Sequence, residues 1–139
     1  MMFTKGRRMW FNLIALMFVV FLFTGCDYNI KWLNGKWEGV GCQLDMEDND
    51  TWSINLEIDI DKQLFEIEYP SLGCAGNWVL IDYSNDRAIF NELITENDKN
   101  DCIEKGTVIL TKVDEKHISF SYYIYSDKDV LAFSTLRRK

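Results

Sequence analysis

Apolar and polar residues alternate with a period of two through most of the chain after its first third. Between residues 52 and 60, large apolar side chains occupy the even positions, and polar or acidic ones fill all the odd positions. This alternation is typical of a strand with one buried face and one exposed face. Polar turn signals separate such segments. The pattern predicts eight strands, at residues 35–43, 52–60, 65–69, 77–83, 87–95, 107–113, 117–125 and 130–136.

Eight consecutive strands joined mostly by short turns predict an all-β fold, a single antiparallel meander closed as a small barrel. Closure would leave no unpaired strand edge. A two-sheet sandwich is the alternative arrangement. An eight-stranded barrel either holds one small ligand or is filled by side chains. We expect a filled interior because the candidate inward residues are large: Trp52, Phe65, Trp78, Phe90 and Phe120.

The first 25 residues have the pattern of an export signal. Three basic residues among the first eight precede an almost wholly apolar stretch, residues 10–23. A basic start, a short apolar region and small residues before a cleavage point are typical of secretory signals. The following Phe23-Thr24-Gly25-Cys26 resembles a bacterial lipobox. This resemblance implies that Cys26 is lipidated, for example with palmitate, and that the chain is anchored to a membrane.

Two other interpretations of this region stay open. One is a single transmembrane helix, although a span needs about 20 apolar residues and Asp27 follows the shorter stretch closely. The other is a plain cleaved signal in which Cys26 is incidental. The lipoprotein interpretation divides the chain into a signal peptide (1–25), a lipidated tether (26–33) and a barrel domain (34–139). It places the protein on the periplasmic face of the inner or outer membrane, or on the cell surface.

The charge of the chain is acidic. It has 15 basic and 22 acidic residues, a formal net charge of −7, and the predicted signal contains three of the basic ones. Nucleic-acid binding depends on neutralising phosphates with Lys and Arg, so this balance argues against a nucleic-acid partner. A cationic ligand or a basic protein would be attracted. Solubility alone would explain the same charge.

The sequence contains no recognisable catalytic set, and we expect a protein that is not an enzyme and has no cofactor. The one histidine, His117, opens a predicted strand without an identifiable nucleophile or orienting partner. Acidic segments at 45–50 and 96–101 offer oxygen ligands but lack the order of an EF-hand loop. We expect both to be solvated loops and predict no metal site. Tyr123 and Tyr125 would share one face of their strand, either as an exposed tyrosine patch for protein or sugar contact or as the ordinary outer face of a sheet.

Three cysteines besides Cys26 allow three single disulfide pairings, and the residues alone do not choose among them. The segment Tyr69-Pro70-Ser71-Leu72-Gly73-Cys74, with a later Cys102, resembles a small all-β extracytoplasmic domain. That domain occurs in bacterial lipoproteins and at the outer end of some bacterial serine/threonine kinases. The resemblance implies a Cys74–Cys102 disulfide and leaves Cys42 outside the pattern.

The segment Gly35-Lys36-Trp37 looks like the G-x-W opening of lipocalins and their calycin relatives. In that family the tryptophan packs across the barrel floor against a basic residue near the chain end. The resemblance implies that Trp37 closes the barrel together with Arg137 or Arg138, through a cation–π contact.

These observations favour a non-catalytic, membrane-anchored bacterial lipoprotein whose barrel domain binds a partner protein in the cell envelope. A lipocalin-like carrier of a small ligand is one alternative. An inhibitor of a cationic envelope enzyme such as lysozyme is another, although the loop motifs of such inhibitors are not found here.

Overall fold

The computed structural model describes residues 29–44, 50–124 and 129–139. A short 3-10 helix, η2 (Lys31–Leu33), precedes eight strands. These are β1 (Gly35–Gln43), β2 (Thr51–Asp59), β3 (Leu64–Tyr69), β4 (Cys74–Tyr83), β5 (Arg87–Asn97), β6 (Lys105–Lys112), β7 (His117–Tyr123) and β8 (Ala132–Arg138). The predicted signal peptide, Cys26 and Tyr125 lie outside the described residues, as does most of the acidic segment 45–50. No helix within the described ranges is long and apolar enough to cross a membrane.

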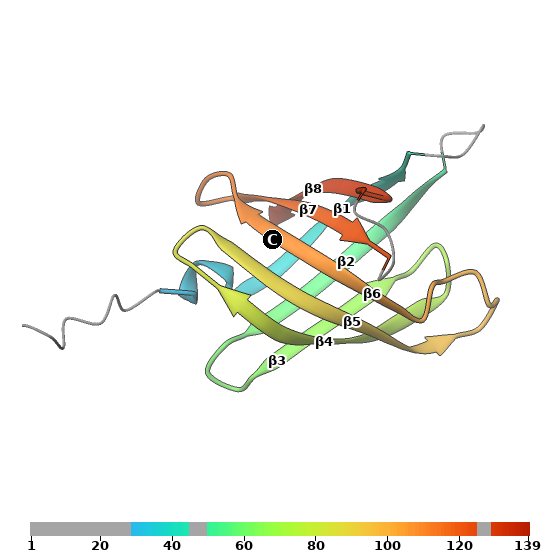
Figure 1. The fold of residues 1–139 in the computed structure, drawn as a ribbon, viewed down its shortest axis with the longest axis horizontal. Helices are drawn as coiled ribbons and strands as arrows, with labels where there is room; N and C mark the ends of the chain where they lie inside the picture. The colour runs from blue at the N-terminus through green and yellow to red at the C-terminus, as the bar shows by residue number, and fades with distance from the viewer. Residues whose placement is uncertain (1–28, 45–49, 125–128) are drawn as a thin grey trace, which may run out of the picture.

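The eight strands form one closed antiparallel barrel, which confirms the predicted fold class (Figure 1). Each strand pairs with the next along the chain, and β1 pairs with β8 to close the ring. In the middle of this β1–β8 seam the hydroxyl of Ser134 donates a hydrogen bond of 2.8 Å to the carbonyl of Val40. Because every strand has two neighbours, no sheet edge is left unpaired.

The period-two alternation places the apolar side chains in the barrel interior. On β2 these are Ile54, Leu56 and Ile58, each at most 2% exposed. In the middle of the barrel, four of the expected aromatic residues pack together. Ring centroids are 5.4 Å apart for Phe65 and Phe90, 5.2 Å for Trp78 and Phe90, and 6.2 Å for Trp78 and Phe120.

One end of the barrel is closed by η2, at the left of Figure 1. Leu33 is fully buried there, and the indole of Trp37 donates a hydrogen bond of 2.8 Å to its carbonyl. Ile30 is also buried. The packed domain therefore begins before residue 34, the boundary expected from the sequence, since these side chains belong to the core rather than to a tether.

Arg138 lies over Trp37, with its guanidinium carbon 4.1 Å from the ring centroid. The guanidinium also donates hydrogen bonds to the carbonyls of Trp32 and Asn34. Gly35 is required beside it, because its φ of +128° disfavours other residues and a Cβ would come within 2.7 Å of Arg138.

Arg137 does not take part in this closure. Its side chain faces outward and pairs with Glu38 at 2.9 Å. The reason is the extent of β8, which continues to Arg138 instead of ending at residue 136 as expected. Strand alternation then places Arg138 inward and Arg137 outward.

Candidate functional site

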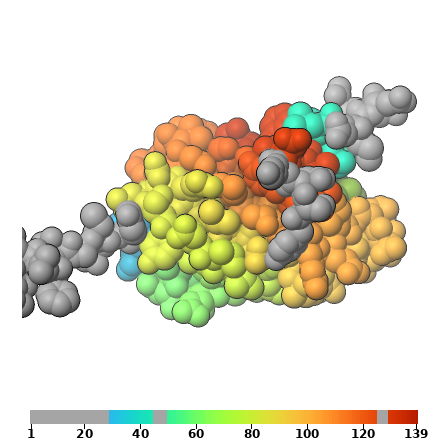
Figure 2. Space-filling model, viewed as in Figure 1, coloured from blue at the N-terminus to red at the C-terminus, as the bar shows by residue number. Residues whose placement is uncertain are grey.

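A pocket of about 440 Å³ lies at the end of the barrel opposite η2. Its lining includes Trp52, Tyr69, Leu72, Glu92, Phe120 and Tyr122. Figure 2 shows the side of the barrel that faces the viewer in Figure 1. Outside the grey atoms, this side is a nearly continuous surface. The loops that follow β1, β3, β5 and β7 each contribute at least one lining residue, and all four loops lie at this end of the barrel. The pocket therefore opens at this end.

The pocket corrects the expectation of a wholly filled interior. Phe65, Trp78, Phe90 and Phe120 fill the middle of the barrel, but Trp52 is only partly buried and forms part of the pocket wall. The Trp52 ring lies directly against the backbone of a glycine, since a Cβ at position 41 would clash with it. The ring thereby follows the barrel wall and leaves the lumen beside it open.

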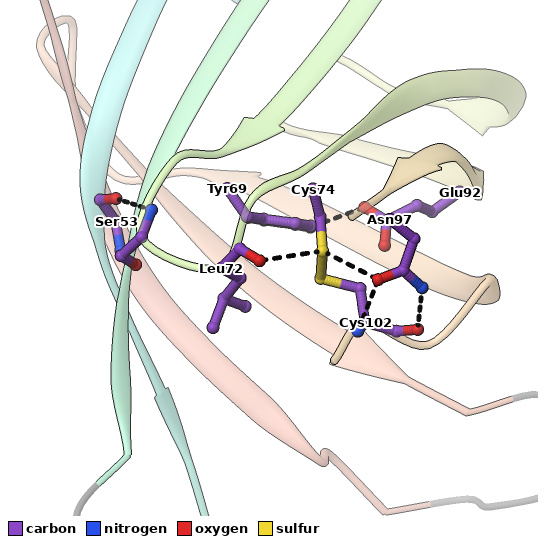
Figure 3. The surroundings of a disulfide bond; sticks show 8 residues. Ser53, Tyr69, Leu72, Cys74, Glu92, Asn97 and Cys102 are labelled. Atoms are coloured by element: carbon purple, nitrogen blue, oxygen red, sulfur yellow. Dashed lines mark hydrogen bonds between the residues drawn. A yellow bond between two sulfur atoms is a disulfide. The ribbon is translucent and has the colours of Figure 1, made fainter. Parts of the chain in front are cut away.

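Glu92 on β5 is the main polar group of the pocket. Its side chain faces inward between Phe90 and Ile94, and the residue is only 3% exposed. Its Oε2 accepts hydrogen bonds from the Tyr69 hydroxyl at 2.6 Å and from the Trp78 indole at 2.8 Å. Figure 3 shows Tyr69 pointing toward Glu92. Burial raises the pKa of the Glu92 carboxyl, and these two hydrogen bonds offset part of that rise.

Tyr122 on β7 adds a second buried polar group. Its hydroxyl is buried and has no hydrogen-bond partner among the described residues. It lies against Gly106, where a Cβ would collide with it, and Gly106 is the direct cross-strand partner of Glu92. Burial raises the pKa of Tyr122, and the nearby Glu92 charge raises it further. The pKa of Tyr69 is raised for the same two reasons.

We expect Glu92→Gln to increase the stability of the ligand-free protein near neutral pH and to change it little near pH 4. In the unfolded chain the Glu92 carboxyl has a pKa near 4.5, whereas in the folded protein its pKa is higher. As the pH rises between these values, the unfolded state loses its proton first. The wild type then loses stability at about 1.4 kcal/mol per pH unit, and the loss stops above the folded pKa.

Urea unfolding of both proteins at several pH values between about 4 and 8 measures this difference. Glutamine keeps an oxygen that can accept from Tyr69 and Trp78, so the variant mainly removes the charge. Glu96→Gln, an exposed position on the same strand, is the matched control and should show no comparable trend. A Glu92→Gln protein that is destabilised equally at every pH would contradict the expectation.

The Cys74–Cys102 disulfide is present, as the resemblance implied, and lies at the edge of the pocket. It joins the start of β4 to the β5–β6 loop (Figure 3). The Asn97 side chain fixes the same loop, since its amide donates to the Cys102 carbonyl at 2.9 Å and its oxygen accepts from the Cys102 N–H at 3.3 Å. The disulfide and Asn97 together hold one side of the pocket entrance.

Three other residues considered from the sequence, His117, Cys42 and Tyr123, do not line the pocket. His117 opens β7 at the closed end of the barrel, where its Nδ1 lies 2.9 Å from the carboxylate of Asp114. Cys42 is a free, partly exposed cysteine on β1. Tyr123 is partly exposed. In the part of the chain that the structure describes, no group of three or more His, Cys, Asp or Glu side chains could hold a metal ion.

Sequence reasoning did not single out Glu92, although a signal was present. Between residues 88 and 94 the inward positions are Ala88, Phe90, Glu92 and Ile94. A carboxylate on an otherwise apolar strand face is unusual, because burying a charge is costly without compensation. The alternation that places Phe120 inward also places Tyr122 inward, but nothing in the sequence indicates that its hydroxyl lacks a partner.

Comparisons with known proteins support the fold. No family model matches the chain, and a search of curated proteins found no match. Among solved structures, the chain is similar to a redesigned beta barrel, with a TM-score of 0.51 and 14% sequence identity. The alignment covers 78% of this chain and 93% of the redesigned barrel. At this identity the likeness shows a barrel architecture and nothing about ligands.

Proposed function

We propose that this protein is a membrane-anchored bacterial lipoprotein whose barrel binds a small ligand without catalysis. The pocket at the open end of the barrel is the observation that carries this proposal. Its volume of about 440 Å³ falls within the range of roughly 300–1,000 Å³ common for small-molecule sites. Such sites combine mainly apolar walls with a few placed polar groups, and here Glu92, Tyr69 and Tyr122 are the buried polar groups of the lining.

The anchored location rests on the sequence. The export pattern of residues 1–25 and the lipobox-like segment ending at Cys26 support it. The Cys74–Cys102 disulfide is compatible with an oxidising compartment outside the cytoplasm. A lipid on Cys26 would hold the barrel at a membrane surface without a spanning segment.

Binding of an envelope protein is a second candidate function, and it would use a different surface. Val79 and Ile81 on the outer face of β4 are 59% and 54% exposed. Exposed apolar residues grouped on one strand face are a feature of protein contact surfaces. This wall is separate from the pocket, so the two functions can be tested independently.

Native mass spectrometry of the full chain, extracted from its own membrane in a non-ionic detergent, tests the small-ligand function. We expect a stoichiometric small-molecule adduct that is lost on unfolding. Leu72→Trp enlarges a partly buried side chain of the pocket lining and should abolish the adduct. Leu93→Trp, at a position 44% exposed on β5, is the matched control and should retain it. An adduct that survives in Leu72→Trp, or its absence from the wild type, would contradict the proposal.

A further inference from the structure

We propose that the pocket selects a small organic ammonium ion, whose positive head lies between Glu92 and Tyr122 and whose apolar part contacts the aromatic wall. This inference rests on the proposed small-ligand function and specifies the chemical class of the ligand. Three separate features of the described residues support it: a buried carboxylate without a cationic partner, a buried hydroxyl without a partner, and an aromatic lining.

The first feature is the missing counter-charge of Glu92. None of the ion pairs among the described residues includes this carboxylate. Both of its hydrogen bonds come from uncharged donors and reach the same oxygen, Oε2. Buried charges in proteins are normally paired, because an isolated one is costly to desolvate. An ammonium group in the pocket would provide the missing charge and a donor for Oε1.

The second feature is the hydroxyl of Tyr122. The residue is 6% exposed, lines the pocket and has its hydroxyl oxygen buried without a partner. Its position against Gly106, the cross-strand partner of Glu92, places the phenol on the same side of the lumen as the carboxylate. A buried polar group without a hydrogen bond is costly. A ligand head with more than one N–H could donate to both Glu92 and Tyr122.

The third feature is the aromatic character of the walls. Trp52, Tyr69, Phe120 and Tyr122 all line the pocket. The faces of aromatic rings attract organic cations, and such rings are the usual surroundings of bound ammonium groups. An anionic ligand is disfavoured at the same place, since it would approach the Glu92 carboxylate.

The negative charge around the pocket entrance also favours a cationic ligand. Asp50 and Asp101 are exposed and belong to the pocket lining. The chain as a whole has a net charge of −7. Like-signed charge around an opening raises the local concentration of ions of the opposite sign. Cations are therefore favoured both in approaching the pocket and at its base.

Three probes of nearly equal size separate charge from shape: benzylammonium, benzyl alcohol and benzoate. Their affinities are measured by titration calorimetry with the full chain in non-ionic detergent near neutral pH. We expect benzylammonium to bind at least about tenfold more tightly than benzyl alcohol, because hydrogen bonds to a charged group are the stronger ones. Benzoate should bind most weakly. Leu72→Trp should abolish binding of the preferred probe.

Glu92→Gln should remove the preference for benzylammonium over benzyl alcohol, and Tyr122→Phe should weaken benzylammonium binding by a few-fold. Glu96→Gln removes an exposed carboxylate from the same strand and should retain the preference. Equal binding of benzylammonium and benzyl alcohol in the wild type would overturn the ammonium inference and leave the small-ligand function intact. So would a preference for benzoate. Failure of the wild type to bind benzylammonium also overturns it, while the native adduct separately decides the small-ligand function.

Discussion

Replacing Trp37 with alanine should lower the free energy of unfolding by about 3–5 kcal/mol, the usual cost of truncating a large buried aromatic residue. Trp37 is 1% exposed and contacts both η2 and Arg138, which together close this end of the barrel. Its indole donates to the Leu33 carbonyl of η2, and its ring faces the guanidinium of Arg138. Alanine would remove these contacts and leave a cavity beneath Arg138. Urea denaturation measures the change.

Phe133→Ala is the matched control for this substitution. Phe133 is also an aromatic residue of the β1–β8 seam, where it pairs with Cys42, but it is 44% exposed. We expect a loss of less than about 1 kcal/mol there, as is usual at exposed positions away from special features. A similarly small loss for Trp37→Ala would show that Trp37 does not close the barrel.

Removing the Cys74–Cys102 disulfide by a double substitution to alanine should cost roughly 3–4 kcal/mol in the chain-entropy model. The bonded cysteines are 28 residues apart in sequence. The bond therefore restricts a sizeable loop in the unfolded chain. Chemical denaturation under oxidising conditions, compared with the wild type, measures the loss.

Two comparisons isolate the disulfide from the packing of the cysteine side chains. A reducing agent should destabilise the wild type by a similar amount and leave the double variant unchanged. Cys42→Ala, at the free cysteine, should change stability little. Equal unfolding midpoints for wild type and double variant without reductant would contradict a stabilising role for the bond.

The barrel could be predicted from the sequence because most of its strands alternate mainly apolar inward positions with mainly polar outward ones. On β2, the alternation from Trp52 to Ile58 specifies both the strand and its inward side. Strand ends were less predictable. β4 begins at Cys74 rather than at residue 77, and its first inward positions are Cys74 and Gly76. These small residues give little hydrophobic signal, so the sequence pattern does not extend to them.

The two arginines at the end of β8 show how the position of a strand end decides which residue closes the barrel. Two adjacent arginines were equivalent candidates while β8 was expected to end at residue 136. Continuing the alternation from Ser134 and Leu136 by one step selects Arg138. Whether the strand continues depends on its pairing with β1, where Trp37 lies opposite Arg138. That pairing joins residues about 100 positions apart and cannot be seen in a local pattern.

The pocket could not be predicted from residue sizes. Counting large inward side chains suggests a filled lumen, because it ignores the direction in which each ring lies. Trp52 and Tyr122 both lie against glycines, Gly41 and Gly106. In each of these contacts the aromatic ring lies close to the barrel wall, because glycine has no side chain there. The space that the ring would otherwise fill stays open in the lumen. This outcome depends on cross-strand register, which sets which glycine faces which ring.

The position of Asn29 has a consequence for how an anchored barrel would stand on its membrane. Its backbone N–H donates to the side chain of Asn85, in the β4–β5 turn at the closed end. Only two residues, Asp27 and Tyr28, lie between it and Cys26, and the three Cα–Cα steps span roughly 10 Å when fully extended. If Cys26 is lipidated as proposed, the closed end rests within that distance of the lipid headgroups. The pocket then faces the aqueous side, and its ligand would be exchanged with solution rather than drawn from the bilayer.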